Sequence, residues 1–117
     1  MTRILLADDN PASRSALALL LTTRLNACIV GEASTMECLL EQAALSHPDV
    51  VLLDWELPGK PEADRISVIR SVTPGARVVV FSARPEAASQ AFEADGFINK
   101  IDPPEFILEV LKERNDR

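Results

Sequence analysis

The chain has 117 residues, of which 47% are hydrophobic and 26% are charged, a composition typical of one compact globular domain. Twelve basic and eighteen acidic residues give a formal net charge of −6, which argues against direct binding of this chain to nucleic acid through the phosphate backbone. The longest apolar run near the N-terminus, residues 16–21, is too short for a signal peptide or a membrane span, so we expect no contact with a membrane.

The N-terminal part of the chain alternates strand and helix signals. The apolar run 3–7 predicts a first strand, after which Asn10-Pro11 offers an N-cap and a proline at the first helical position. Leucines at helical spacing then predict an amphipathic helix that ends near Leu25 or Asn26. Residues 28–32 suit a second strand, and the serine and glutamate of 34–37 have the spacing of a capping box that opens a second helix.

The alternation continues to the end of the chain. The apolar runs 50–53 and 78–81 are continuous, which is typical of strands covered on both faces, and a short third helix is expected between them. Pro85 is expected to open a fourth helix, residues 96–99 to form a fifth strand, and residues 102–105 to cap a last helix. Five strands alternating with five helices predict an α/β fold, a doubly wound parallel sheet.

Polar residues follow the ends of the predicted strands. Because parallel strands all point the same way, these residues are expected to converge on one edge of the sheet. They are Asp8, Asp9, Asp54, Ser82 and Lys100. Three carboxylates repel each other unless a cation is present, and Mg²⁺ suits oxygen ligands while keeping positions open for a phosphoryl oxygen. One carboxylate would then act as nucleophile, with the lysine and the serine hydroxyl contacting the phosphoryl group.

Four segments resemble the motifs of response regulator receiver domains of two-component systems, and the resemblance covers essentially the full chain. The segments are residues 4–10, 51–58, 81–83 and 97–100. The resemblance implies a flavodoxin-like strand order 2-1-3-4-5. It further implies that Asp54 is the phosphoacceptor and that Asp9, Asp54 and the main-chain carbonyl of Glu56 bind Mg²⁺, with Asp8 acting through water. Lys100 would contact the phosphoryl group.

The resemblance also implies a conformational switch. Ser82 would be drawn to the phosphoryl group and vacate space into which Phe97 turns. Glu56 and Arg84 would flank the phosphoryl group and influence how long it survives, although they can equally form an ordinary surface ion pair. Trp55 is equally consistent with a lid over the site and with a packed loop residue. Taken singly, these residues also fit turn signals, surface charges and core packing, so the prediction depends on their joint order.

The chain departs from the family pattern at three places. Relatives often have Asp-Gly a few residues after the proline that follows the phosphoacceptor, where this chain has residues 59–63, so the start of the third helix is left open. Relatives also commonly have a proline in a cis peptide after the lysine, where this chain has Ile101, so the isomer of that peptide bond is left open. Phe97 replaces a tyrosine found in many relatives, which removes a phenolic hydrogen bond to an output partner.

The implied function is that of a signalling switch and not of an enzyme with a separate substrate. The domain would take phosphate from a sensor histidine kinase or a histidine phosphotransfer protein and control an output domain or a downstream protein. Residues 29–33 resemble receivers joined to helix-turn-helix output domains, so residues 1–117 are compatible with the N-terminal part of a transcription regulator. Cys28 and Cys38 have no paired spacing, which favours a reducing, cytoplasmic location.

Two rival functions and one question of assembly stay open. A degenerate receiver would serve as a phosphorylation-independent interaction module. A phosphatase with an aspartyl nucleophile usually has two acids one residue apart after its first strand, unlike Asp8-Asp9-Asn10 here. Formation of a homodimer through the last helices is compatible with the sequence, which offers no support for it.

Overall fold

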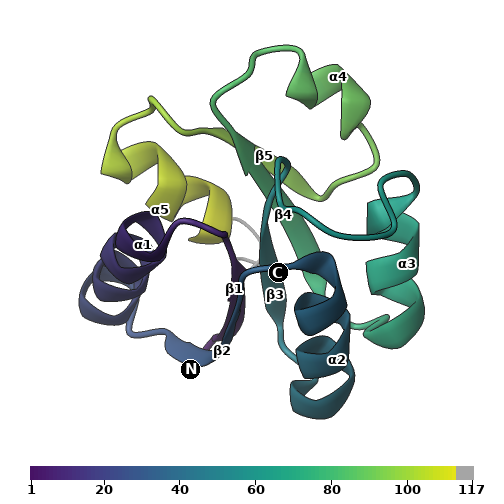
Figure 1. Cartoon of the computed structure of the whole chain (residues 1–117). Coiled ribbons are helices and arrows are strands. Elements are labelled where there is room, and N and C mark those ends of the chain that lie inside the picture. Colours follow the sequence, from purple (N-terminus) through teal and green to yellow (C-terminus); the bar gives the residue numbers. More distant parts are fainter. Residues whose placement is uncertain (113–117) are drawn as a thin grey trace.

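The computed structural model describes residues 1–112, in which five strands alternate with five helices (Figure 1). In chain order the elements are β1 Arg3–Ala7, α1 Pro11–Arg24, β2 Cys28–Ala33, α2 Met36–Ser46, β3 Val50–Asp54, α3 Arg65–Val72, β4 Arg77–Ser82, α4 Ala87–Gln90, β5 Gly96–Asn99 and α5 Pro104–Lys112. All paired strands are parallel and their order is β2-β1-β3-β4-β5. Both the predicted doubly wound sheet and the strand order 2-1-3-4-5 are confirmed.

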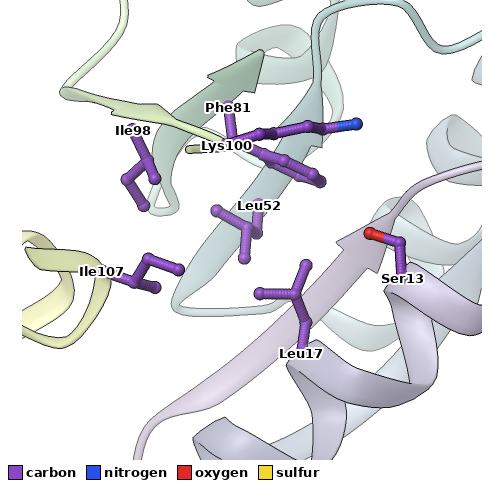
Figure 2. Close-up of a pocket in the computed structure, with 7 residues that line it drawn as sticks. All are labelled: Ser13, Leu17, Leu52, Phe81, Ile98, Lys100 and Ile107. Carbon is purple, nitrogen blue, oxygen red and sulfur yellow. The ribbon is translucent and has the colours of Figure 1, made fainter. Parts of the chain in front are cut away.

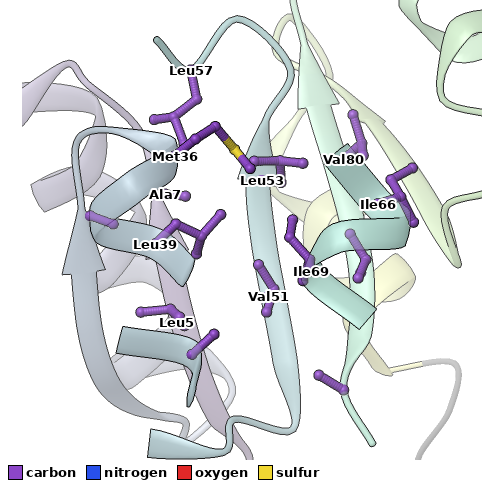
Figure 3. Packing of buried hydrophobic residues seen from close by; sticks show 14 of the residues in the cluster. Leu5, Ala7, Met36, Leu39, Val51, Leu53, Leu57, Ile66, Ile69 and Val80 are labelled. Carbon is purple, nitrogen blue, oxygen red and sulfur yellow. The ribbon is translucent and has the colours of Figure 1, made fainter. Parts of the chain in front are cut away.

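The alternating direction of side chains along the central strands builds a separate core on each face of the sheet. In β3, Val51 and Leu53 pack with buried residues of α2 and α3, a cluster that Figure 3 shows from close by. Val50 and Leu52 point to the other face and pack with Leu21 of α1 and with residues of α5. The continuous apolar runs are therefore strands covered on both faces, as predicted, and Figure 1 shows α1 and α5 on one side and α2 and α3 on the other.

The ends of the first two helices test the capping predictions. Asn10 caps α1, since its side chain accepts a hydrogen bond from the Ser13 amide at 3.0 Å and Pro11 is the first helical residue. The capping box at 34–37 is wrong by one residue. Thr35 is the N-cap of α2, and its side chain accepts from the Cys38 amide at 3.1 Å. The Glu37 carboxylate accepts from the Lys60 amide at 3.4 Å and not from a backbone amide at the N-cap.

The C-terminal elements also differ in detail from the prediction. The fourth helix begins at Ala87 and not at Pro85, whose carbonyl accepts from the Ala88 amide in the preceding turn, and the helix has only four residues. The Asp102 carboxylate accepts from the Asn99 amide at 3.3 Å, so it closes the turn after β5 and does not cap α5. Within residues 1–112 the cis peptide bond is Lys60–Pro61, and the bond before Ile101 is trans.

No helix among the described residues combines the length and the apolar composition that crossing a bilayer requires.

Candidate functional site

The carboxyl ends of four parallel strands bring the predicted site residues to one edge of the sheet. Asp54 and Ser82 are the last residues of β3 and β4, which pair in register next to each other. Asp8 follows β1, on the other side of β3, and Lys100 follows β5. Parallel pairing therefore juxtaposes residues that lie up to 92 positions apart in sequence, from Asp8 to Lys100.

An acidic cluster occupies the centre of this edge. Ligand oxygens of Asp8, Asp9 and Asp54 all lie within 4.8 Å of one another, with Asp8 fully buried and Asp9 exposed. One Asp8 oxygen accepts from the Asn10 amide at 3.0 Å, while the other, Oδ2, is buried and has no hydrogen-bond partner in residues 1–112. A buried carboxylate oxygen without a partner is costly, and a hard divalent cation that coordinates oxygen would satisfy it. The cluster therefore fits Mg²⁺.

The Asp54 carboxylate is buried and held from two sides. Its Oδ1 accepts from the Glu56 amide at 2.9 Å, and its Oδ2 accepts from the Lys100 ammonium at 3.0 Å. Burial raises the pKa of the Asp54 carboxyl, because the charged form loses solvation, and the charge of Asp8 adds to this rise. The hydrogen bonds from Glu56 and Lys100 lower that pKa and so oppose the effect. A bound divalent cation would also favour the charged carboxylate.

Lys100 is fixed by the backbone of the neighbouring strand and by an aromatic ring. Its main-chain amide donates to the Ser82 carbonyl at 2.9 Å, which continues the pairing of β4 with β5. Its ammonium nitrogen lies 4.9 Å from the centre of the Phe81 ring, a cation–π contact. Among residues 1–112 the Lys100 side chain therefore has one charged partner, Asp54, and one aromatic contact, Phe81.

Ser82, Glu56 and Arg84 form a hydrogen-bonded group beside the acidic cluster. The Ser82 hydroxyl donates to the Glu56 carboxylate at 2.9 Å and accepts from the Arg84 amide at 3.0 Å. The Arg84 guanidinium pairs with Glu56 at 3.0 Å, and the two side chains are 47% and 38% exposed. An ion pair this exposed contributes about 0–1 kcal/mol. The ordinary surface ion pair that the sequence allowed for Glu56 and Arg84 is therefore present in the structure.

The two aromatic residues of interest pack on the same core. Trp55 and Phe97 are both partly buried against the cluster that contains Leu53 and Ile66. The Trp55 indole also donates to the side-chain carbonyl of Gln90 at 3.0 Å. Trp55 is thus a packed loop residue that ties the segment after β3 to the last residue of α4.

Two cavities flank this edge of the sheet. One, of about 270 Å³, lies between α1 and α5 next to Lys100, and Figure 2 shows its mostly apolar lining. Its lining residues are Ser13, Leu17, Leu52, Phe81, Ile98, Lys100 and Ile107. The other, of about 620 Å³, is lined by Trp55, Glu56, Arg84 and residues of the segment between β3 and α3.

Sequence reasoning missed one residue close to the site, Arg65. Its side chain is buried, with 7% of the residue exposed, and its guanidinium donates to main-chain carbonyls of the segment between β3 and α3. Arg65 is the first residue of α3, where the helix dipole disfavours a positive charge. That mismatch is the signal that could have identified it.

Comparison with known proteins agrees with this geometry. The model of the family described as the response regulator receiver domain matches residues 4–112. The nitrate/nitrite response regulator protein NarL of Escherichia coli K12 is 35% identical over 112 residues, which cover 92% of this chain and 52% of that protein. The transcriptional activator protein ExaE of Pseudomonas putida is 35% identical over 113 residues, covering 93% and 53%. The chain thus spans about half the length of these relatives.

Solved structures and a further relative extend the comparison. The signal receiver domain of the response regulator NarL from Mycobacterium tuberculosis superposes with a TM-score of 0.86 at 29% identity, covering 98% of this chain and 96% of that one. Protein-glutamate methylesterase/protein-glutamine glutaminase 2 of Cereibacter sphaeroides is 39% identical over 109 residues, which are 88% of this chain and only 29% of that enzyme. Family model, relatives and fold agree, and this chain belongs to the response regulator receiver domains of two-component systems.

Proposed function

We propose that this receiver domain accepts a phosphoryl group on Asp54 in a Mg²⁺-dependent reaction and thereby changes conformation. One observation carries the proposal: a buried carboxylate at a strand end is flanked by a lysine ammonium at 3.0 Å on one side and by two further carboxylates within 4.8 Å on the other. A carboxylate with a purely structural role would be stabilised by the lysine alone, whereas the two further carboxylates repel it. A nucleophile that must meet a dianionic phosphoryl group needs both the cation site and the lysine.

The residues that would hold the metal are those of the acidic cluster with the main chain of Glu56. Asp9 and Asp54 would supply carboxylate oxygens, the Glu56 carbonyl a third ligand, and the buried Oδ2 of Asp8 would act through a water. When bound, Mg²⁺ neutralises charge on the transferring phosphoryl oxygens and orients the group for in-line attack. The Asp8 Oδ2 atom would then have the partner that residues 1–112 do not provide.

The chain's own residues would perform the transfer. An oxygen of Asp54 attacks the phosphorus of a phosphohistidine, and the phosphorus–nitrogen bond breaks. The histidine imidazole is the leaving group, and an acyl phosphate forms on Asp54. The Lys100 ammonium would exchange its contact with Asp54 for one with a phosphoryl oxygen, which keeps its charge paired throughout. The cation–π contact with Phe81 holds the lysine stem during that exchange.

The switch would begin at Ser82. In the structure its hydroxyl donates to Glu56, so a phosphoryl group on Asp54 has to compete with the Glu56 carboxylate for this hydrogen. When the Ser82 hydroxyl donates to the phosphoryl group instead, its hydrogen bond to Glu56 would be lost. Glu56 and Arg84 would then lie free at the mouth of the site, where they tune how fast water removes the phosphate. Phe97, half-buried on the adjacent strand, would turn into the vacated space.

The family and the length of the relatives support a proposal for the biological setting. We propose that a sensor histidine kinase or a histidine phosphotransfer protein in the cytoplasm supplies the phosphate. Because relatives such as NarL and ExaE are about twice as long as the matched region, the proposed output is a further domain or a downstream protein that regulates transcription. Residues 1–117 would then be the N-terminal receiver of a longer regulator.

The proposal is tested by phosphorylation with acetyl phosphate. We expect intact mass spectrometry to detect one added phosphoryl group only when Mg²⁺ is present, and to detect none in Asp54→Asn. Failure of any adduct to form, together with no change of Trp55 fluorescence on adding beryllofluoride, would favour the phosphorylation-independent interaction module. Sustained hydrolysis of a phosphomonoester would instead favour the phosphatase reading.

A further inference from the structure

The segment between β3 and α3, residues 55–64, is held by a buried arginine that follows it in the chain. Three nitrogens of the Arg65 guanidinium each donate to a different carbonyl of this segment: Nη1 to Leu57 at 2.5 Å, Nε to Pro61 at 2.8 Å and Nη2 to Gly59 at 3.0 Å. Arg65 opens α3, and a helical side chain points back toward the N-terminus, so its guanidinium folds over the residues before it. One side chain thus satisfies three loop carbonyls.

The same segment has few regular contacts of its own. Asp64, at the N-cap position of α3, has a positive φ of 57° and makes no side-chain capping bond. Gly59 has a φ of 109°, a conformation that favours glycine. The Pro58 carbonyl accepts from the Met36 amide at 2.8 Å, which docks the segment on the start of α2. Arg65 and α2 therefore both hold the segment in place.

The guanidinium lies one peptide unit away from the proposed metal ligand. The Leu57 amide donates to the Asp54 carbonyl at 3.0 Å, and this amide shares a planar trans peptide group with the Glu56 carbonyl. The Leu57 carbonyl, in the next peptide group, is fixed by Arg65. Two hydrogen bonds therefore restrain the direction of the Glu56 carbonyl, one within its own peptide group and one in the next peptide group along the chain.

We propose that Arg65 is a positioning residue for the divalent cation. Its three hydrogen bonds to the loop carbonyls orient the Glu56 carbonyl toward the acidic cluster. The inference rests on the proposed function, which makes that carbonyl a ligand. Where many relatives have Asp-Gly, this chain has residues 59–63, and the carbonyls of Gly59 and Pro61 in that stretch accept hydrogen bonds from Arg65. A helix start is otherwise a poor place for a positive charge.

The charge of Arg65 and the shape of its guanidinium make separable contributions. Burial lowers the pKa of the Arg65 guanidinium, while the carboxylates of Glu62, Asp54 and Glu37 act in the opposite direction, and the group stays charged at neutral pH. A lysine at this position would keep the charge near Asp54 but lose the planar fork that reaches three carbonyls. A glutamine would lose both.

The experiment compares Mg²⁺ affinity in four proteins: wild type, Arg65→Lys, Arg65→Gln and the control Arg77→Gln. Arg77 is the matched control because it is equally buried, at 7%, and its guanidinium also donates to main-chain carbonyls, those of Val110 and Leu111 on α5. The midpoint of a Mg²⁺ titration followed by Trp55 fluorescence gives the dissociation constant. Urea unfolding of each protein gives its stability.

We expect both Arg65 variants to bind Mg²⁺ about tenfold more weakly, the usual loss when a residue that orients a metal ligand is removed. Arg77→Gln should lose stability while its Mg²⁺ affinity stays within twofold of wild type. In the metal-free proteins, amide hydrogen exchange of Glu56 and Leu57 should accelerate in the Arg65 variants but not in Arg77→Gln. This exchange measurement needs no metal and reports on the loop directly.

Three results would overturn the inference. Wild-type affinity in Arg65→Lys would mean that charge alone suffices, and an equal loss in Arg77→Gln would mean that affinity only follows stability. Unchanged exchange at Glu56 and Leu57 in Arg65→Gln would mean that the loop does not need the arginine. A wild-type protein that binds no Mg²⁺ at millimolar concentration would overturn the proposed metal site itself, a result separate from the other three.

Discussion

Replacing Asp8 by asparagine should stabilise the metal-free protein, although it removes a charged group from the proposed metal site. Asp8 is fully buried and its Oδ2 atom has no hydrogen-bond partner in residues 1–112, while Asp54 and Asp9 oxygens lie within 4.8 Å. An asparagine at this position can still accept from the Asn10 amide, and its amide group can donate to a neighbouring carboxylate. The substitution thus converts a repulsive contact into a hydrogen bond.

The size of the effect follows from the separation of the charges. Two unit charges at 4.8 Å repel by about 3.5 kcal/mol at an effective dielectric constant of about 20. The exposure of Asp9 and the ammonium of Lys100 screen this repulsion, so we expect Asp8→Asn to raise the free energy of unfolding by about 1–2 kcal/mol. For a domain of this size that corresponds to a rise in Tm of roughly 3–8 °C.

Magnesium should reverse the order of stability. Saturating the wild-type protein at about 100 times its dissociation constant adds about 2.7 kcal/mol of stability, whereas the variant, which lacks one carboxylate, should gain much less. The assay is urea unfolding followed by far-UV circular dichroism, with EDTA or with Mg²⁺. Glu41→Gln is the control, because Glu41 is exposed on α2 and the substitution changes the net charge equally.

The reasoning would be refuted by one result above all. If Asp8→Asn is less stable than wild type in EDTA, the carboxylates do not repel each other in the folded protein, and the argument for a cation at this edge loses its electrostatic basis.

Three further predictions concern the site and the core. Arg84→Ala should change the phosphoryl lifetime at least twofold and leave Mg²⁺ affinity nearly unchanged. The reason is that the Arg84 side chain is 47% exposed and contacts Glu56 but none of the acidic cluster. An unaltered dephosphorylation rate would contradict this prediction. Mg²⁺ affinity should fall as the pH is lowered from 7.5 to 5. The raised pKa of the Asp54 carboxyl keeps it protonated to higher pH than an ordinary aspartate, so protons compete with the metal. Equal midpoints of the Mg²⁺ titration, followed by Trp55 fluorescence at both pH values, would argue against this prediction. Leu53→Ala should destabilise the protein by about 3 kcal/mol in urea unfolding, because Leu53 is fully buried. Leu19→Ala, on the exposed side of α1, should change the free energy of unfolding by less than about 0.5 kcal/mol. Similar losses in both variants would show that burial does not determine the loss of stability.

The sequence by itself determined the fold class and the gathering of the site. Continuous apolar runs identified the strands covered on both faces, and parallel pairing then required the residues at strand ends to converge, so the sequence alone grouped Asp8, Asp54 and Lys100. These inferences succeed because hydrophobic periodicity and strand direction are properties of short segments. They depend little on which distant residues pack against them.

Contacts between distant segments were decided only by the tertiary structure. Ser34 and Thr35 are equally good caps by type, and the choice of Thr35 depends on how the start of α2 docks against Pro58 and Lys60. The Ser82 hydroxyl bonds Glu56 because two loops from neighbouring strands meet, and no local pattern encodes that meeting. Arg65 has a charged side chain and is nevertheless buried, since three loop carbonyls accept hydrogen bonds from its guanidinium. Side-chain partners far apart along the chain are selected by packing, because the free energy of each contact exists only once both segments are in place.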